Sequence, residues 1–162
     1  MTSRFVSEGG ELQVSSAAQL ELLEELTRHG AALRTEVRGA SMSPFIQDRD
    51  VVTISPLGRR EPQLGDVLAI GMQMPERLVI HRVVARAGAG LLTKGDNLRA
   101  PDAIVERDLV LGRVVRVERN GRDVDYVAGW RASLVAALSR ADLLRHLVGL
   151  RRTLRRVFRE ER

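Results

Sequence analysis

The sequence of 162 residues predicts a mainly β domain with a helix on either side of it, which is an α+β protein overall. Short segments rich in β-branched residues follow one another between residues 33 and 119, separated by Gly, Pro and Asp clusters. Segments with the apolar spacing of helices precede and follow them. We therefore divide the chain into a leader with a short amphipathic helix (1–32), a β-rich domain (33–128) and an Arg-rich amphipathic helical tail (129–162).

The first helix is predicted just before the β region. Ser15 or Ser16 is a suitable N-cap, and Gly30 is typical of the residue that follows the last turn of a helix. Leucines recur near helical spacing between these two points, and they are Leu20, Leu23 and Leu26. The residues before Ser15 carry no periodic pattern, so we expect a loose leader there.

Six strands are predicted from Leu33 onward. They are LRTEV (33–37), VVTI (51–54), VLAIGM (67–72), RLVIHRVVA (77–85), LLTK (91–94) and DLVLGRVVRVER (108–119). No segment of helical length separates them, so the pattern favours an antiparallel sheet over a doubly wound α/β fold. Asn120-Gly121 predicts a two-residue hairpin turn after the last of these strands.

The positive charge of the chain is concentrated in its tail. The formal net charge is +5, and residues 130–162 hold nine Arg against three acidic residues. The apolar residues of one helical face in this tail are Leu147, Leu150, Leu154, Val157 and Phe158. Two interpretations follow: a helix that packs on the domain with its arginines solvated, or an amphipathic helix on an anionic membrane surface.

Composition excludes several classes of site and partner. The chain has no cysteine, which excludes disulfides, thiolate metal sites and a cysteine nucleophile. Aromatic residues make up only 3%, too few for base-stacking platforms, so we do not expect a nucleic acid partner. The sequence has neither a spanning apolar run nor a secretory signal, so we expect a cytoplasmic protein. Peripheral attachment to a membrane would depend on the second interpretation of the tail. We predict no metal and no cofactor.

Ser41, in the segment GASMSP, is the first candidate for chemistry. A serine hydroxyl is a weak nucleophile unless a base accepts its proton. His29 and His146 fall in predicted helices, where solvated histidines are common, whereas His81 lies in a predicted strand. Histidine titrates near neutral pH and suits a general base, although a lone histidine in a strand is also a common structural residue.

Asp96 and Asp102, which follow the strand LLTK, are the candidates for orienting such a base. Both residues also fit ordinary turn positions. Spacing alone therefore makes Ser41, His81 and Asp102 a suggestive set and no more. Lys94 is a weaker alternative base, because a lysine base must be buried to lose its proton and a lysine beside a turn is usually solvated.

The segments GASMSP, IHRVV and TKGDN…APD, in this order, resemble the successive motifs of the type I signal peptidase family, most closely its endoplasmic-reticulum-type branch. The resemblance covers the chain from about residue 35 to residue 117 and implies a mainly β peptidase core. It implies that Ser41 is the nucleophile and His81 the general base. It further implies that Asp102 orients His81, while Asp96 holds the loop.

The resemblance also concerns the residues next to the nucleophile. Met42 follows Ser41 as in that family, but Gly39 stands where signal peptidases usually have a serine that helps to bind the oxyanion. The resemblance therefore implies an oxyanion hole of backbone N–H groups alone. Gly-Ala-Ser-Met is also similar to the Gly-x-Ser-Met pattern of LexA-type self-cleaving repressors.

We therefore expect a serine endopeptidase that cleaves a precursor or signal-like peptide after small residues by a Ser-His-Asp mechanism. The first alternative is a LexA-type self-cleaving transcriptional regulator. No Ala-Gly bond precedes Ser41, however, and the residues before the β region are too few for a helix-turn-helix domain. The second alternative is a non-catalytic relative that binds peptides.

Overall fold

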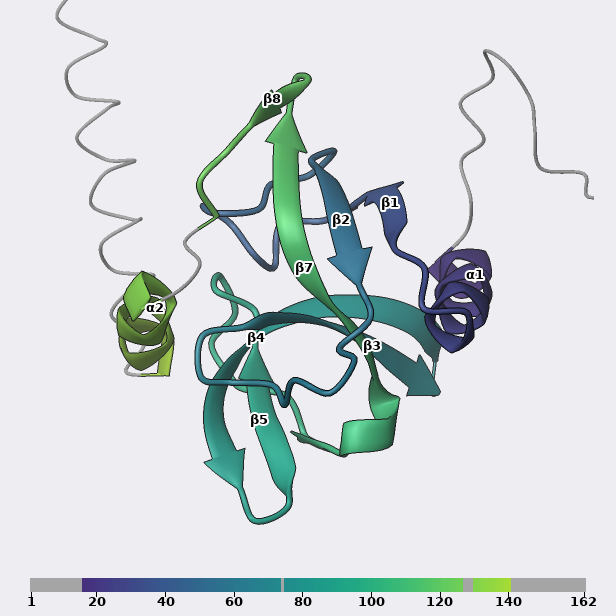
Figure 1. The fold of residues 1–162 in the computed structure, drawn as a ribbon. Coiled ribbons are helices and arrows are strands. Elements are labelled where there is room, and N and C mark those ends of the chain that lie inside the picture. Colours follow the sequence, from purple (N-terminus) through teal and green to yellow (C-terminus); the bar gives the residue numbers. More distant parts are fainter. Residues whose placement is uncertain (1–15, 74, 127–129, 141–162) are drawn as a thin grey trace, which may run out of the picture.

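An antiparallel sheet of eight strands dominates the computed structural model, which describes residues 16–73, 75–126 and 130–140 (Figure 1). Two short helices accompany the sheet, which confirms the α+β class. In chain order the elements are α1 (Ser16–Arg28), β1 (Leu33–Glu36), β2 (Val51–Ser55), β3 (Val67–Gln73), β4 (Glu76–Ala87), β5 (Gly90–Lys94), β6 (Ile104–Val105), a 3-10 turn (Arg107–Leu109), β7 (Val110–Arg119), β8 (Arg122–Asp123) and α2 (Trp130–Arg140). Within the described segments, neither helix has the length and apolar character needed to cross a membrane.

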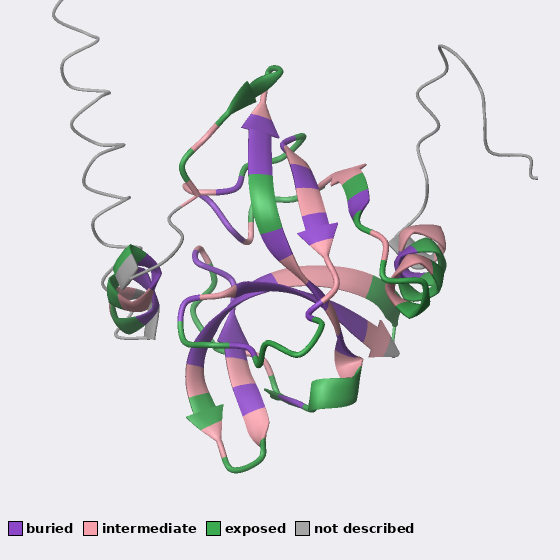
Figure 2. Ribbon diagram, in the orientation of Figure 1, coloured by how far each residue is buried: buried purple, intermediate pink, exposed green. Residues whose placement is uncertain are grey.

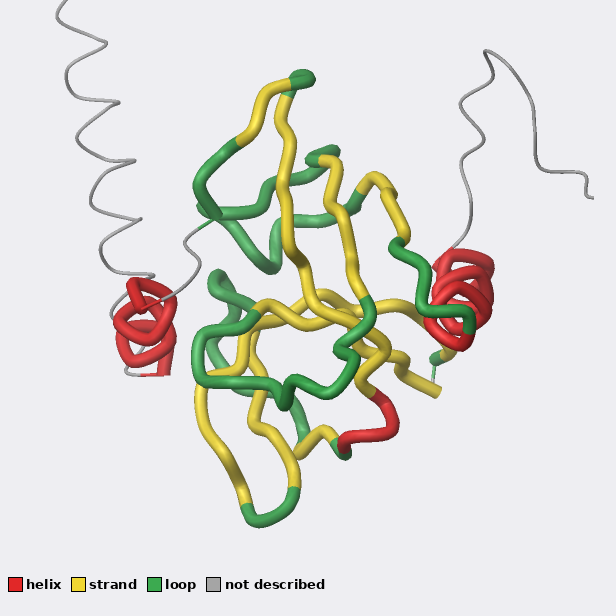
Figure 3. The backbone as a smooth tube through the Cα atoms, in the orientation of Figure 1, coloured by secondary structure: helices red, strands yellow, loops and turns green. Residues whose placement is uncertain are grey.

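All six predicted strands are present, and the structure adds the two-residue strands β6 and β8 (Figure 3). The predicted hairpin turn is confirmed, because Arg119 of β7 pairs with Arg122 of β8 across Asn120-Gly121. Asn120 and Gly121 have φ angles of 52° and 72°, and two positive φ values are what a type I′ turn requires.

The sheet has the strand order β1-β2-β7-β3-β4-β5-β6. The long strand β4 changes its neighbours along its length: residues 76–82 pair with β3, whereas residues 82–87 pair with β5. Among the described residues, β1 pairs only with β2, and the first half of β4 pairs only with β3. Each of these two strands therefore has a backbone edge that no other strand covers.

Successive side chains of β3 point to opposite faces and enter two separate core clusters. Figure 2 shows that most of this strand is buried. Val67 and Ala69 point into a first cluster with the apolar residues of β2, β7 and the loop after β1. Leu68 and Ile70 point the other way, into a second cluster with apolar residues of β4 and β5. Because β3 is buried on both faces, it reads in the sequence as a continuous apolar run.

The two helices pack on opposite sides of the sheet (Figure 1). Helix α1 contributes the fully buried Leu23 to the first cluster. Helix α2 buries Ala132 and Ala136, and it approaches the turn before β3 so closely that a Cβ on Gly65 would lie 2.5 Å from the carbonyl carbon of Ala132. The predicted leader and the apolar face of the tail after residue 140 lie outside the described residues.

Candidate active site

Ser41 lies in the loop between β1 and β2, and an ion pair holds the base of this loop. The Val37 N–H donates to the Asp50 carbonyl at 2.9 Å. The buried Asp50 carboxylate accepts two hydrogen bonds of 2.7 Å from the Arg119 guanidinium at the end of β7, and this hydrogen bonding raises the pKa of Arg119. The ends of the loop are thereby fixed to the sheet.

Met42 and Ile46 attach the middle of the same loop to the core. Both side chains are buried in the first cluster, beside residues of β2 and β7. Met42 points inward, and its neighbour Ser41 is only half-buried and borders a cavity. The Ser-Met pair thus combines an anchor with an accessible hydroxyl.

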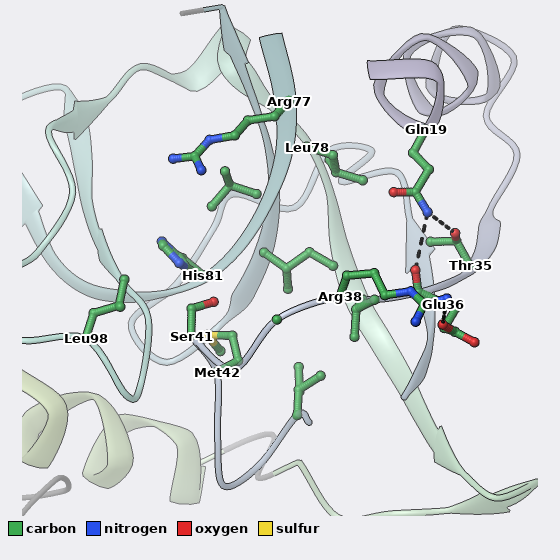
Figure 4. A pocket seen from close by; sticks show the side chains of 15 residues that line it. Gln19, Thr35, Glu36, Arg38, Ser41, Met42, Arg77, Leu78, His81 and Leu98 are labelled. Carbon is green, nitrogen blue, oxygen red and sulfur yellow. Dashed lines mark hydrogen bonds and ion pairs between the residues drawn. The ribbon is translucent and has the colours of Figure 1, made fainter. Parts of the chain in front are cut away.

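The cavity has a volume of about 390 Å³ and lies between β1 with its following loop and the first half of β4 (Figure 4). Ser41 and His81 lie side by side at one end of it. Its lining includes Gln19, Thr35, Glu36, Val37, Arg38, Gly39, Met42, Ile46, Arg77, Leu78, Val79, Ile80 and Leu98. A lining of apolar side chains with a few polar ones is typical of a ligand site.

His81 is held from one side by Asp102 and Thr93. Its Nδ1 lies 2.6 Å from Oδ2 of Asp102, and the Thr93 hydroxyl donates to the same oxygen at 2.6 Å. The Asp102 N–H donates to the Thr93 carbonyl at 2.8 Å, which fixes the carboxylate in place. Because a carboxylate accepts, the proton of a neutral His81 lies on Nδ1, and Nε2 is free to act as the base.

Nε2 of His81 faces the Ser41 loop across Gly95. A Cβ built on Gly95 would lie 3.0 Å from Nε2 and 2.8 Å from the Ser41 carbonyl oxygen, so both groups pack against this glycine. No hydrogen bond joins the Ser41 hydroxyl to the imidazole among the described residues. Such bonds are often long before substrate binds, so the arrangement is compatible with proton transfer.

Asn97 joins the two loops of the site and was not singled out from the sequence. Its N–H donates to the Ser41 carbonyl at 2.7 Å, and its side-chain Nδ2 donates to the Ala40 carbonyl at 3.2 Å. In the sequence, Gly-Asp-Asn is a turn signal, and nothing in it shows that the turn lies against residues 40–41. The amide therefore positions the backbone that carries Ser41.

Asp96 has a different partner from Asp102. Its carboxylate accepts hydrogen bonds of 2.9–3.2 Å from the Arg82 guanidinium, and both side chains are fully buried. Burial raises the pKa of the Asp96 carboxyl, and the ion pair with Arg82 opposes this rise. The Arg82 guanidinium also donates to the Gly65 carbonyl and lies 5.5 Å from the centre of the Phe45 ring. Asp96 thus fixes its loop to β4 and to the Ser41 loop.

The expectation that Lys94 is solvated is wrong. Lys94 is the last residue of β5, paired with Arg82 of β4, and only 3% of it is exposed. The strand continues through this position instead of turning, so the side chain is enclosed. Its charge acts on Asp96, whose pKa it lowers. Lys94 does not border the cavity that Ser41 and His81 share.

The backbone around Ser41 offers one clear donor for an oxyanion. Gly39 has a φ of 98°, which suits glycine, and its N–H donates to the Asp48 carboxylate at 2.8 Å. The N–H of Ser41 has no hydrogen-bond partner among the described residues. It is therefore available to a substrate oxygen that approaches the hydroxyl of the same residue.

Comparison with known proteins leaves this geometry as the basis for interpretation. No protein-family model matches the chain, and no curated protein matches it either. Within the described segments, no group of three or more His, Asp and Glu side chains is arranged to hold a metal ion.

Proposed function

We propose that this protein is a serine endopeptidase in which Ser41 is the nucleophile and His81 the general base. The observation that carries the proposal is the orientation of His81. Asp102 holds its Nδ1 at 2.6 Å, which directs Nε2 toward the Ser41 loop at the end of the cavity. A solvated or purely structural histidine does not need a carboxylate bound to one ring nitrogen. It also does not need a cavity next to the other nitrogen.

The proposed reaction follows the usual course of acyl transfer by serine. His81 Nε2 accepts the Ser41 proton while Oγ attacks the scissile carbonyl, and it then protonates the leaving amine. Water completes the cycle by attacking the acyl-enzyme with the same base. Asp102 stabilises the imidazolium, and the Ser41 N–H donates to the developing oxyanion.

The cavity suits an extended peptide because two uncovered strand edges border it. The N–H and C=O of Val37 bond with Asp50 and Arg49, so the backbone groups of Glu36 and Arg38 point to the other side, where both residues border the cavity. Gln19 donates to the Glu36 carbonyl, which leaves the Glu36 N–H and the Arg38 backbone for a peptide. Across from them lies the uncovered first half of β4, residues 76–81. A peptide can add to such edges by main-chain hydrogen bonds while its side chains enter the cavity.

The resemblance to type I signal peptidases supports the same assignment. It gives Ser41, His81 and Asp102 the roles proposed here, and it implies a precursor peptide with small residues before the cut bond as substrate. The mainly β architecture fits the peptidase core that the resemblance implies.

Labelling by a fluorophosphonate probe tests the proposal. Wild-type protein is expected to be labelled, whereas Ser41→Ala and His81→Ala lose labelling with unchanged melting temperatures. Lys94→Met keeps the buried aliphatic stem but removes the amine, and it should still be labelled. Labelling that survives in His81→Ala but is lost in Lys94→Met would assign the base to Lys94. A wild-type protein that is neither labelled nor able to cleave a peptide library would instead be a peptide-binding relative.

A further inference from the structure

We infer that Arg77 makes the cavity selective for peptides that carry an acidic side chain about four residues from the cut bond. The inference rests on the proposed peptidase function and specifies its substrate. Alternate residues of a strand point to the same face, so Arg77, Val79 and His81 share one face of β4. All three border the cavity, and Figure 4 shows Arg77 reaching over it from the same strand as His81.

Arg77 leaves the cavity wall with one uncompensated positive charge. The carboxylate of Glu36 is the acidic group in the lining, and it lies 2.8 Å from the guanidinium of Arg38. Among the described residues, no carboxylate lies within ion-pair distance of Arg77. Glu36 and Arg38 therefore neutralise each other, and the guanidinium of Arg77 remains available to a bound ligand.

The register of a bound peptide determines which of its side chains meets this charge. A peptide that adds to the uncovered edge of β4 advances along the strand residue for residue, at about 3.3 Å each. The position next to His81 holds the bond to be cut, and Arg77 is four residues away on the same face. A carboxylate there can accept two parallel hydrogen bonds from the guanidinium, a geometry that lysine lacks.

Cleavage profiles of a decapeptide library, analysed by mass spectrometry, test the inference. Wild-type enzyme should cleave peptides with Asp or Glu at one position about four residues from the cut about threefold to fivefold better than those with Asn or Gln, as a single partly exposed ion pair allows. Arg77→Glu should reverse the preference to Lys or Arg at that position, and Arg77→Gln should abolish it. Arg60→Glu, in the loop after β2 and away from the cavity, is the matched charge control and should keep the wild-type profile.

Peptide binding to an inactive variant tests the role of Arg77 independently of whether the protein is a peptidase. Ser41→Ala, which keeps the cavity, is titrated with fluorescein-labelled decapeptides that differ only by Asp or Lys at one position. A several-fold preference for Asp that disappears in Ser41→Ala/Arg77→Gln supports the inference even if the wild type cleaves nothing. Cleavage without any charge preference, or equal binding of both peptides, would overturn the role of Arg77 and leave the peptidase proposal intact.

Discussion

His81 is fixed by side chains that come from two later segments of the chain. The His81 imidazole and the hydroxyl of Thr93 in β5 share one carboxylate oxygen of Asp102 in the following loop, each at 2.6 Å. Spacing in the sequence leaves both Asp96 and Asp102 open as partners, because both follow the same strand. In the structure the two carboxylates have different partners. Arg82 donates a hydrogen bond to Asp96, and the His81 imidazole is hydrogen-bonded to Asp102.

Replacing Asp102 by asparagine tests the orientation of the base. Asp102→Asn keeps the size of the side chain but offers Nδ1 a mixture of donor and acceptor, which favours the wrong imidazole tautomer. Under the proposed mechanism, we expect kcat for peptide cleavage to fall by about 10³- to 10⁴-fold, the size of effect that losing this carboxylate has in a Ser-His-Asp triad. Thermal unfolding measured in parallel should change little, and a fall in kcat of less than tenfold would show that Asp102 does not orient the base.

Residues that act across loops could not be found in the sequence. Asn97 is readily recognised as a turn residue, and that local interpretation is correct. Its hydrogen bonds to the backbone of residues 40–41 depend on how the sheet brings two distant loops together. The prediction that Lys94 is solvated was wrong for a related reason. Its burial follows from its place at the end of a paired strand.

At the scale of elements, the strands were the most predictable part of the fold. Alternating and continuous apolar runs located all six longer strands, because burial on one or both faces leaves a pattern over four or more residues. The strands β6 and β8 have two residues each, too few to carry any pattern. The order of strands in the sheet, and with it the uncovered edge of β4, depends on tertiary pairing that a single sequence does not encode locally.

The contact between the loop after β5 and the loop after β1 should control the rate of cleavage. Asn97→Ala removes the side-chain donor to the Ala40 carbonyl and so loosens the backbone next to Ser41, although the backbone hydrogen bond from residue 97 to the Ser41 carbonyl remains. We expect kcat to fall by about 10- to 100-fold with KM nearly unchanged, because small displacements of a nucleophile have effects of this size.

Asn97→Asp is the matched variant for this contact. It keeps the turn but removes the amide donor, so it should lose a similar part of kcat. A wild-type kcat in both variants, measured on the same peptide, would show that the contact between the loops has no part in catalysis.

At the scale of the whole molecule, two helices pack against the sheet, one beside the cavity and the other against β4 and the turn before β3. Helix α1 lies beside the cavity, where Gln19 donates to the Thr35 hydroxyl and to the Glu36 carbonyl. Helix α2 lies against β4 and the turn before β3, far along the chain from the segment it covers. Gly65 makes this second contact possible, since any side chain there would meet the backbone of Ala132.

A glycine-to-alanine pair isolates the contribution of this contact to stability. Gly65 and Gly88 both have positive φ angles, of 90° and 59°, but only Gly65 has atoms close to the position of an added Cβ. Gly88→Ala should cost about 1–2 kcal/mol of unfolding free energy from backbone strain alone. Gly65→Ala should cost a further amount of about 1–3 kcal/mol from overpacking.

The two variants should also differ in amide hydrogen exchange. Residues 131–140 should exchange faster in Gly65→Ala but not in Gly88→Ala, because only the first displaces α2. Equal unfolding free energies from chemical denaturation, with equal exchange in α2, would contradict the close packing of the helix on the sheet.

Gly95 has a consequence for how proteins of this kind diverge. The space its missing side chain leaves is already shared by the Ser41 carbonyl, the His81 imidazole and the Leu98 side chain. Any larger residue would push apart Ser41 and His81, the proposed nucleophile and base, without altering either side chain. A descendant of this chain that keeps Ser41, His81 and Asp102 but carries a side chain at position 95 is therefore expected to have lost catalysis while retaining its fold. Position 95 would thus distinguish a working enzyme from a pseudoenzyme when the catalytic residues themselves do not.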